Sequence, residues 1–164
     1  MKKKRVYIET TIVSYLTARP TRDLILTAHQ EITREWWEAC RRAFELFVSR
    51  LVLDEAARGD AEAAAKRLAI LRDLPELPVT GEATGLAARL LREGLLPRQA
   101  AADAMHLAMA TVHCMDALLT WNCRHLANAS ILGEVGMFVR RMQYELPIVC
   151  TPDELMGESG SLGD

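Results

Sequence analysis

The stretch Arg5-Val6-Tyr7-Ile8-Glu9-Thr10-Thr11-Ile12-Val13 joins a β-prone run to the start of a helix. Arg5–Ile8 predicts a short buried strand that ends at Glu9. The pair Thr10-Thr11 is typical of a helix cap, and Ile12–Leu16 predicts a short helical turn. The chain therefore passes from a strand into a helix through an acid, which places a carboxylate at the end of the first predicted strand.

The same alternation of strand and helix continues along the chain. Further strands are expected at Phe44–Ser49, Leu77–Thr80, Asp116–Thr120 and Pro147–Cys150. Helices are expected at Asp23–Arg42, Leu51–Arg58, Ala61–Leu74, Glu82–Glu93, Pro97–His113 and Gly133–Glu145. Because Pro78 cannot donate to a strand ladder, its strand is expected near an edge. The pattern predicts an α/β fold of three layers, with a mostly parallel central sheet of about five short strands flanked by helices.

Length and composition fit one domain. The chain has 164 residues, of which 50% are hydrophobic and 26% charged. Residues 1–156 are expected to form the domain, and residues 157–164 a flexible C-terminal tail. No run of about 18 apolar residues is present, which excludes a membrane span. The basic start of the chain, Met1–Arg5, is followed by Val6–Ile8 and then Glu9 and not by an apolar signal segment, so a cytoplasmic protein is expected.

Charge and cysteine content narrow the class of protein. A net charge of −2 argues against a passive, tight nucleic-acid binder, because phosphate neutralisation supplies most of that affinity. It argues less against an enzyme whose carboxylates bind metal ions, since the bound metal reverses the local charge. Disulfides are not expected in a cytoplasmic chain of this size. A zinc site could draw on four residues whose spacing matches no common ligand pattern, so packing cysteines are favoured: His113, Cys114, Cys123 and His125.

Polar residues stand where the predicted parallel strands end, which is where such sheets gather reactive groups. Glu9 follows the first strand, Glu55 lies in the helix after the second, and Asn122 follows the fourth. Asp103 is a lone carboxylate within the small apolar stretch Ala100–Met105. Converging carboxylates repel one another unless a cation lies among them, and Mg²⁺ or Mn²⁺ suits an all-oxygen site. Taken singly, each residue also has an ordinary structural explanation, such as a solvated strand end or a turn.

Four segments taken in order resemble the PIN-domain family, to which the VapC-type toxins of bacterial toxin–antitoxin pairs belong: Tyr7–Val13, Val52–Glu55, Asp103–Ala108 and Leu118–Asn122. In that family a strand ends at an acid followed by Ser or Thr, and a second segment supplies a Glu. A third supplies an Asp before a small apolar helix, and a fourth reads Thr-x-Asp or Thr-x-Asn. The resemblance spans nearly the whole chain, from Val6 to Pro152. No single motif is specific, but the four in this order are fairly specific.

The resemblance implies a metal-dependent endoribonuclease. Three acids would hold Mg²⁺ or Mn²⁺: Glu9, Glu55 and Asp103. Asn122 would occupy the fourth, more variable position of the catalytic set, and the hydroxyls of Thr10 and Thr120 would orient the acids. By the same resemblance we expect a homodimer, an RNA substrate and a small antitoxin partner, so that the protein would be the toxin of a pair.

Four further side chains are candidates for substrate contacts: His106, Trp121, Arg124 and His125. His106 lies one helical turn after Asp103, where a hydrogen-bonded structural histidine is the favoured interpretation. Arg124 and His125 could bind an RNA phosphate, and Trp121 could offer a stacking face. The pair Trp36-Trp37 is expected mainly in core packing, with one ring facing outward as a candidate partner contact.

Two departures from the family pattern suggest an alternative function. The first acid is usually Asp, and Glu9 is longer by one methylene; Asn122 carries one charge less than Asp. Both changes bear on affinity for a hard cation. The alternative is therefore a PIN-fold binding or regulatory module with weakened catalysis. A third hypothesis, suggested by the net negative charge, is a generic α/β domain without a nucleic-acid role.

Overall fold

The central strand of the fold is β1 (Lys4–Ile8), whose last three residues are fully buried. It pairs in parallel with β2 (Phe44–Ser49) on one side and with β4 (Ala117–Leu119) on the other. The outer strands β3 (Glu76–Leu77) and β5 (Ile148–Cys150) complete the order β3-β2-β1-β4-β5, again by parallel pairing. The predicted parallel sheet is thus confirmed. The structure, a computed structural model, describes residues 2–156, so the predicted tail at 157–164 lies outside the described residues.

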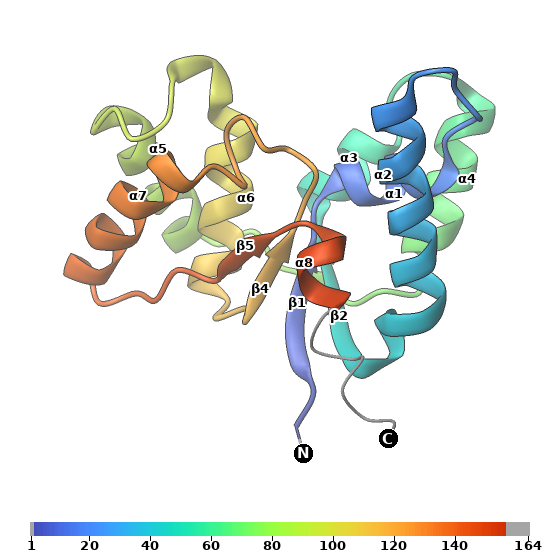
Figure 1. Cartoon of the computed structure of the whole chain (residues 1–164). Coiled ribbons are helices and arrows are strands. Elements are labelled where there is room, and N and C mark those ends of the chain that lie inside the picture. The colour runs from blue at the N-terminus through green and yellow to red at the C-terminus, as the bar shows by residue number, and fades with distance from the viewer. Residues whose placement is uncertain (1, 157–164) are drawn as a thin grey trace.

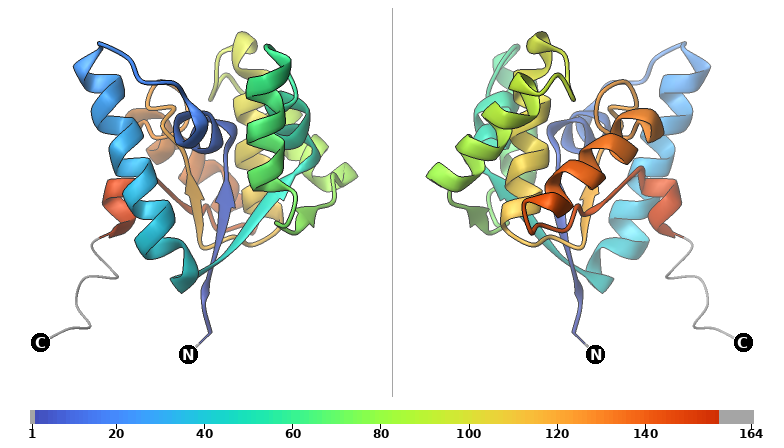
Figure 2. Two further views of the ribbon diagram at one scale, coloured as in Figure 1. Left: turned by 90° about the vertical axis from the view of Figure 1, so that its right-hand side faces the viewer. Right: turned by 90° about the vertical axis from the view of Figure 1, so that its left-hand side faces the viewer.

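Helices cover both faces of this sheet, which confirms the predicted three-layer α/β fold (Figures 1 and 2). One face carries α1 (Thr10–Thr17), α2 (Leu24–Glu35), α3 (Arg50–Ala56) and α4 (Ala61–Leu71). The other carries α5 (Gly81–Arg92), α6 (Ala101–Val112) and α7 (Ala129–Arg141). A short 3-10 turn at Arg98–Ala100 leads into α6. The last described helix, α8 (Pro152–Met156), packs against α2.

The single long helix predicted at Asp23–Arg42 is wrong in its second half. The α-helix ends at Glu35 and continues as a π turn over Trp36–Cys40 and a 3-10 turn over Arg41–Ala43. Trp36 is fully buried and stacks on Phe44, with ring centroids 5.8 Å apart. Buried side chains recur across the junction at nearly helical spacing, so the apolar pattern does not reveal the break.

The side chains of Trp36 and Trp37 lie mainly in the core packing, as predicted. Trp36 is buried, and Trp37 is partly buried beneath the guanidinium of Arg41, which lies 5.0 Å from the ring centroid.

The predicted helix boundaries near the carboxyl terminus also differ from those in the structure. The helix predicted at Gly133–Glu145 spans Ala129–Arg141, because the Asn128 side chain accepts hydrogen bonds from Ser130 and Ile131 N–H and caps an earlier start. The helix α8 was not predicted, although the Glu154 carboxylate accepts the N–H and the hydroxyl of Thr151, which is one half of the cap that a Thr-x-x-Glu sequence favours.

The edge strand β3 is shorter than predicted. It lies at the sheet edge as expected but ends at Leu77, since Pro78 has no N–H to continue the ladder.

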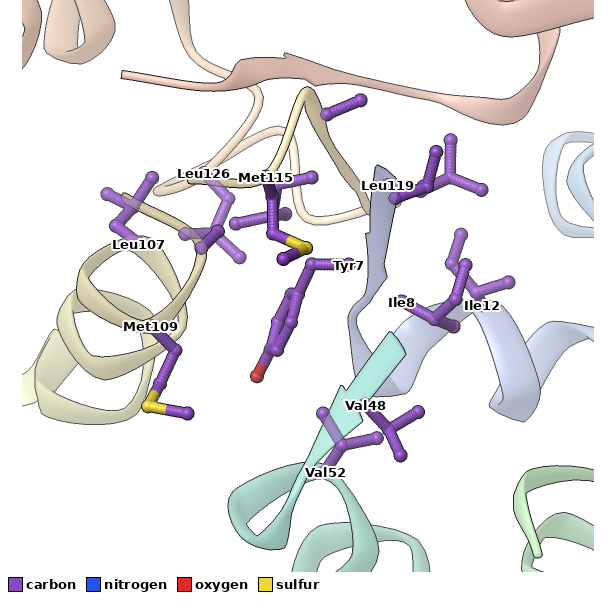
Figure 3. Close-up of a cluster of buried hydrophobic side chains, with 14 of the residues drawn as sticks. Tyr7, Ile8, Ile12, Val48, Val52, Leu107, Met109, Met115, Leu119 and Leu126 are labelled. Carbon is purple, nitrogen blue, oxygen red and sulfur yellow. The ribbon is translucent and has the colours of Figure 1, made fainter. Parts of the chain in front are cut away.

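The core lies on both faces of β1. Figure 3 shows Tyr7 extending towards α6, beside Leu107 and Met109, whereas Ile8 points to the opposite side of the strand, towards Ile12 of α1. Full burial of each such large apolar side chain contributes about 1.5–3 kcal/mol. Among the helices of residues 2–156, none has the length and apolar character that a membrane crossing requires.

Candidate functional site

The candidate site lies where the sheet order reverses. From β1 the chain moves outward to β2 and β3 and then returns to β4 on the other side of β1. In a parallel sheet such a switch point opens a crevice at the carboxyl ends of the strands. Glu9 directly follows β1 and Thr120 directly follows β4, and the Glu9 N–H donates to the carbonyl of Leu119 at 3.1 Å. The first predicted acid therefore lies at the switch point.

Glu9 is held from three directions although only 4% of it is exposed. Its Oε2 accepts hydrogen bonds from the Thr120 hydroxyl at 2.7 Å, the Thr11 N–H at 3.1 Å and the Thr11 hydroxyl. The same carboxylate caps α1. Burial of a carboxylate is costly unless donors replace the lost water, and these three donors do so. Thr11 was not among the predicted residues; the repeated Thr after the acid was its only signal.

Glu55, on α3, reaches the same edge of the sheet from the β2 side, where its carboxylate meets Thr10, the residue after Glu9. Its Oε1 accepts hydrogen bonds from His106 Nε2 at 2.7 Å and from the Thr10 hydroxyl at 3.1 Å. Burial raises the pKa of Glu55, but the hydrogen bond and charge of His106, the Thr10 hydroxyl and the charge of Arg58 together outweigh it. The pKa therefore lies below its ordinary value, and Glu55 is anionic at neutral pH.

Asp103, in the first turn of α6, is bonded through both carboxylate oxygens. Oδ1 accepts from Asn122 Nδ2 at 3.0 Å, and Oδ2 accepts from His125 Nδ1 at 2.9 Å. The Asn122 oxygen is itself occupied, because it accepts the backbone N–H groups of Arg124 and His125. This turn directs the amide nitrogen towards Asp103. Asn122 therefore acts on Asp103 as a donor and presents no oxygen to the crevice.

Behind Glu55, sequence reasoning missed two polar side chains. The Tyr7 hydroxyl lies 2.8 Å from His106 Nδ1 and 2.7 Å from Ser49 Oγ. Burial raises the pKa of Tyr7 far above its ordinary value. The signals in the sequence were a tyrosine inside an otherwise aliphatic strand and a serine at the helix cap. His106 is only 1% exposed and hydrogen-bonded at both ring nitrogens, as expected for the structural histidine that was the favoured interpretation.

Trp121 is also buried. Its ring stacks on His29, with centroids 4.0 Å apart, and its indole N–H donates to Thr33 at 2.7 Å. His29 therefore covers one face of the ring, and base stacking on Trp121 stays a prediction. Arg124 is exposed beside the crevice, and its guanidinium forms no ion pair with the described residues. His125 is mostly buried by its contact with Asp103.

The donor chemistry fits a hard divalent cation. Glu9 Oε1 and Glu55 Oε2 accept no hydrogen bond from the described residues, so each carboxylate keeps one oxygen for a ligand. Within residues 2–156, however, no three acidic, histidine or cysteine side chains lie close enough together to hold one ion. Each oxygen of Asp103 accepts one hydrogen bond from the described residues and keeps a second lone pair, so Asn122 and His125 could remain bonded while Asp103 binds a cation.

The fold and the crevice together define a class, an all-parallel α/β protein with carboxylates at the switch point. Solved VapC structures share this fold. VapBC2 from Rickettsia felis, bound to a DNA fragment from their promoter, is 16% identical with a TM-score of 0.55, over 90% of this chain and 98% of that chain. Mycobacterium tuberculosis VapC20, a sarcin–ricin loop cleaving toxin, is 15% identical with a TM-score of 0.56, over 73% of this chain and 91% of that one.

The chain therefore has the VapC-like PIN-domain fold, as the motif resemblance predicted. No protein-family model matches it, and no curated protein matches it in sequence.

Proposed function

We propose that this protein is a metal-dependent endoribonuclease and the toxin of a toxin–antitoxin pair. The observation that carries the proposal is the position of Glu9, Glu55 and Asp103 around the switch point of a VapC-like PIN fold. One neighbour in fold is a sarcin–ricin loop cleaving toxin, which supports cleavage as the reaction class. Fold likeness alone is a weaker warrant than site geometry, so the proposal depends on these three carboxylates.

The three carboxylates are the proposed ligands of Mg²⁺ or Mn²⁺. When bound, the ion would supply an activated water and offset the charge that builds on the phosphodiester. Glu9 is held for this task by Thr11 and Thr120, and Glu55 by Thr10. Such second contacts fix the direction of a ligand oxygen, which is why they matter to metal affinity.

Arg124 is the proposed contact to the RNA backbone. It lies in the exposed turn that begins at Asn122. Asn122 comes two residues after Thr120, whose hydroxyl donates to Glu9. A guanidinium without an ion-pair partner suits a phosphate bidentately. His125 is proposed to line the same edge of the crevice through its contact with Asp103.

The proposed partners follow from the fold neighbours. The Rickettsia felis structure holds a VapBC pair on promoter DNA, which supports a small antitoxin protein as a partner of this chain. A homodimer and a cytoplasmic location are part of the same proposal. Light scattering on the purified chain tests the dimer, and co-purification with the product of the adjacent gene tests the antitoxin.

The enzymatic proposal is tested by cleavage of a labelled panel of structured RNAs in Mg²⁺, Mn²⁺ or EDTA. Wild type is compared with Asp103→Asn and with a control, Asp54→Asn. Asp54 is an exposed acid next to Glu55 that forms an ion pair with Arg50. We expect metal-dependent cutting by wild type and Asp54→Asn, and none by Asp103→Asn.

Two results would count against the proposal in different ways. Intact metal-dependent cutting by Asp103→Asn would show that the site assignment is wrong. No cutting with either metal, from folded protein free of antitoxin, would favour the binding or regulatory module.

A further inference from the structure

The hydrogen bonds behind Glu55 form a ring that joins four elements of the fold, β1, β2, α3 and α6, and is closed by the backbone of α3. Ser49 ends β2 and caps α3 through the N–H of Val52, and Glu55 lies on that helix. Glu55 is bonded to His106 of α6, His106 to Tyr7 of β1, and Tyr7 back to Ser49. The three side-chain distances between these four residues are 2.7, 2.8 and 2.7 Å, so each is a well-formed hydrogen bond.

The chemistry of the groups limits the direction of these bonds. The carboxylate of Glu55 can only accept, so His106 Nε2 carries the hydrogen. The other ring nitrogen, Nδ1, meets the Tyr7 hydroxyl, which can accept from a ring N–H or donate to a bare ring nitrogen, and the Ser49 hydroxyl can reverse its role to match. The three bonds can therefore all form in either arrangement, and they end on Glu55 Oε1.

Only one member of the ring reaches the crevice. Tyr7 and Ser49 are fully buried and His106 is 1% exposed, whereas the Glu55 side chain is 22% exposed. Figure 3 shows the Tyr7 hydroxyl directed between α6, marked by Met109, and the β2–α3 segment, marked by Val48 and Val52. Bulk water cannot replace a lost partner at this depth, so the Glu55 position depends on side chains that touch neither substrate nor ion.

We propose that Tyr7, His106 and Ser49 are positioning residues that fix the Glu55 carboxylate, and its spacing from Asp103, for cation binding. His106 lies three residues after Asp103 on α6, so the ring ties α3 to the turn that carries the third carboxylate. This inference rests on the proposed function. It assigns the buried histidine, and a strand tyrosine outside the acidic motifs, to the geometry of the metal site.

The test is Mn²⁺ affinity, measured by calorimetry or electron paramagnetic resonance on purified, metal-stripped protein. Tyr7→Phe removes the hydroxyl and keeps the volume of the aromatic side chain. The matched control is Thr111→Val, which removes a buried hydroxyl from α6 that has no hydrogen-bond partner among residues 2–156. Circular dichroism fixes a temperature at which all variants are folded, and binding is measured there.

We expect Tyr7→Phe to bind Mn²⁺ about tenfold more weakly, the lower end of the effect of losing an outer contact to a metal ligand. Thr111→Val should bind as wild type does. His106→Gln keeps a donor that can reach Glu55 and should bind more tightly than His106→Leu. In RNA cleavage, Tyr7→Phe should lower kcat and leave KM unchanged, because no ring member but Glu55 faces the crevice.

The two ways of failing are distinct. Wild type that binds Mn²⁺ together with Tyr7→Phe and His106→Leu variants that bind it equally well would overturn the ring proposal and leave the proposed function standing. Folded wild type that binds no Mn²⁺ would overturn both. Equal affinity of His106→Gln and His106→Leu would also count against a donor role for the imidazole.

Discussion

Thr120→Val should destabilise the protein by far more than the loss of one oxygen suggests. Thr120 is fully buried; its hydroxyl donates to Glu9 Oε2 at 2.7 Å and accepts the N–H of Asn122 at 2.9 Å. A hydrogen bond to a carboxylate contributes about 1.5–3 kcal/mol, and a buried N–H left unpaired costs about 1–3 kcal/mol. The added methyl group recovers about 0.8 kcal/mol. The net loss in free energy of unfolding should be about 2–5 kcal/mol.

Urea denaturation followed by circular dichroism measures this loss, with Thr111→Val as the matched control. Thr111 is also buried in the core, but its hydroxyl has no hydrogen-bond partner within the described part of the chain, so the same change should be neutral or stabilising. The two variants differ only in whether the hydroxyl is bonded. If Thr120→Val and Thr111→Val proved equally stable, the claim that Thr120 supports the Glu9 carboxylate would be refuted.

Three further predictions concern pH and stability. Because burial raises the pKa of Tyr7 in the folded state, its contribution to the free energy of unfolding is fully present below pH 10 and is lost as pH rises further, by up to about 1.4 kcal/mol per pH unit. Tyr7→Phe should lack this pH-dependent loss in urea denaturation between pH 9 and pH 11. The same dependence of stability on pH in Tyr7→Phe and wild type would contradict the prediction. Asn128→Ala should cost about 1 kcal/mol by removing the cap of α7, read from the urea midpoint, with no loss arguing that the cap is dispensable. Trp36→Ala should cost about 3–5 kcal/mol because the ring is fully buried, and a loss below 1 kcal/mol in the same assay would show that the π turn is not anchored by it.

Local patterns in the sequence were sufficient to predict the fold. The run Phe44–Ser49 was placed to the residue, because a β-prone stretch is bounded there by a helix cap at Ser49. Parallel order followed from strands that alternate with helices. The π turn after Glu35 could not be predicted in this way, since Trp36 and Cys40 keep an apolar spacing that also suits an α-helix.

The candidate site was less accessible to sequence reasoning. The strand-end position of Glu9 and the helix positions of Glu55 and Asp103 follow from local pattern, and the structure sets all three around the switch point. Their metal role stays a prediction. Partners far apart in sequence could not be foreseen, as with Tyr7 and His106, which are 99 residues apart, because no local signal reports such a contact.

Burial limits which of the remaining candidate side chains can reach a substrate. Trp121 follows a strand end, as a base-stacking residue could, yet His29 covers one face of its ring. A sequence shows that an aromatic residue is near a site, but not whether another helix packs over it.

The central claim is that the carboxylates of the crevice bind a divalent cation. Calorimetric titration of Mn²⁺ into folded, metal-stripped protein tests it most directly, with Glu9→Gln as the site variant and Asp54→Asn as the exposed control. We predict saturable binding by wild type and Asp54→Asn, and strongly weakened binding by Glu9→Gln. No saturable binding by wild type at millimolar Mn²⁺, or equal binding by Glu9→Gln, would contradict the account.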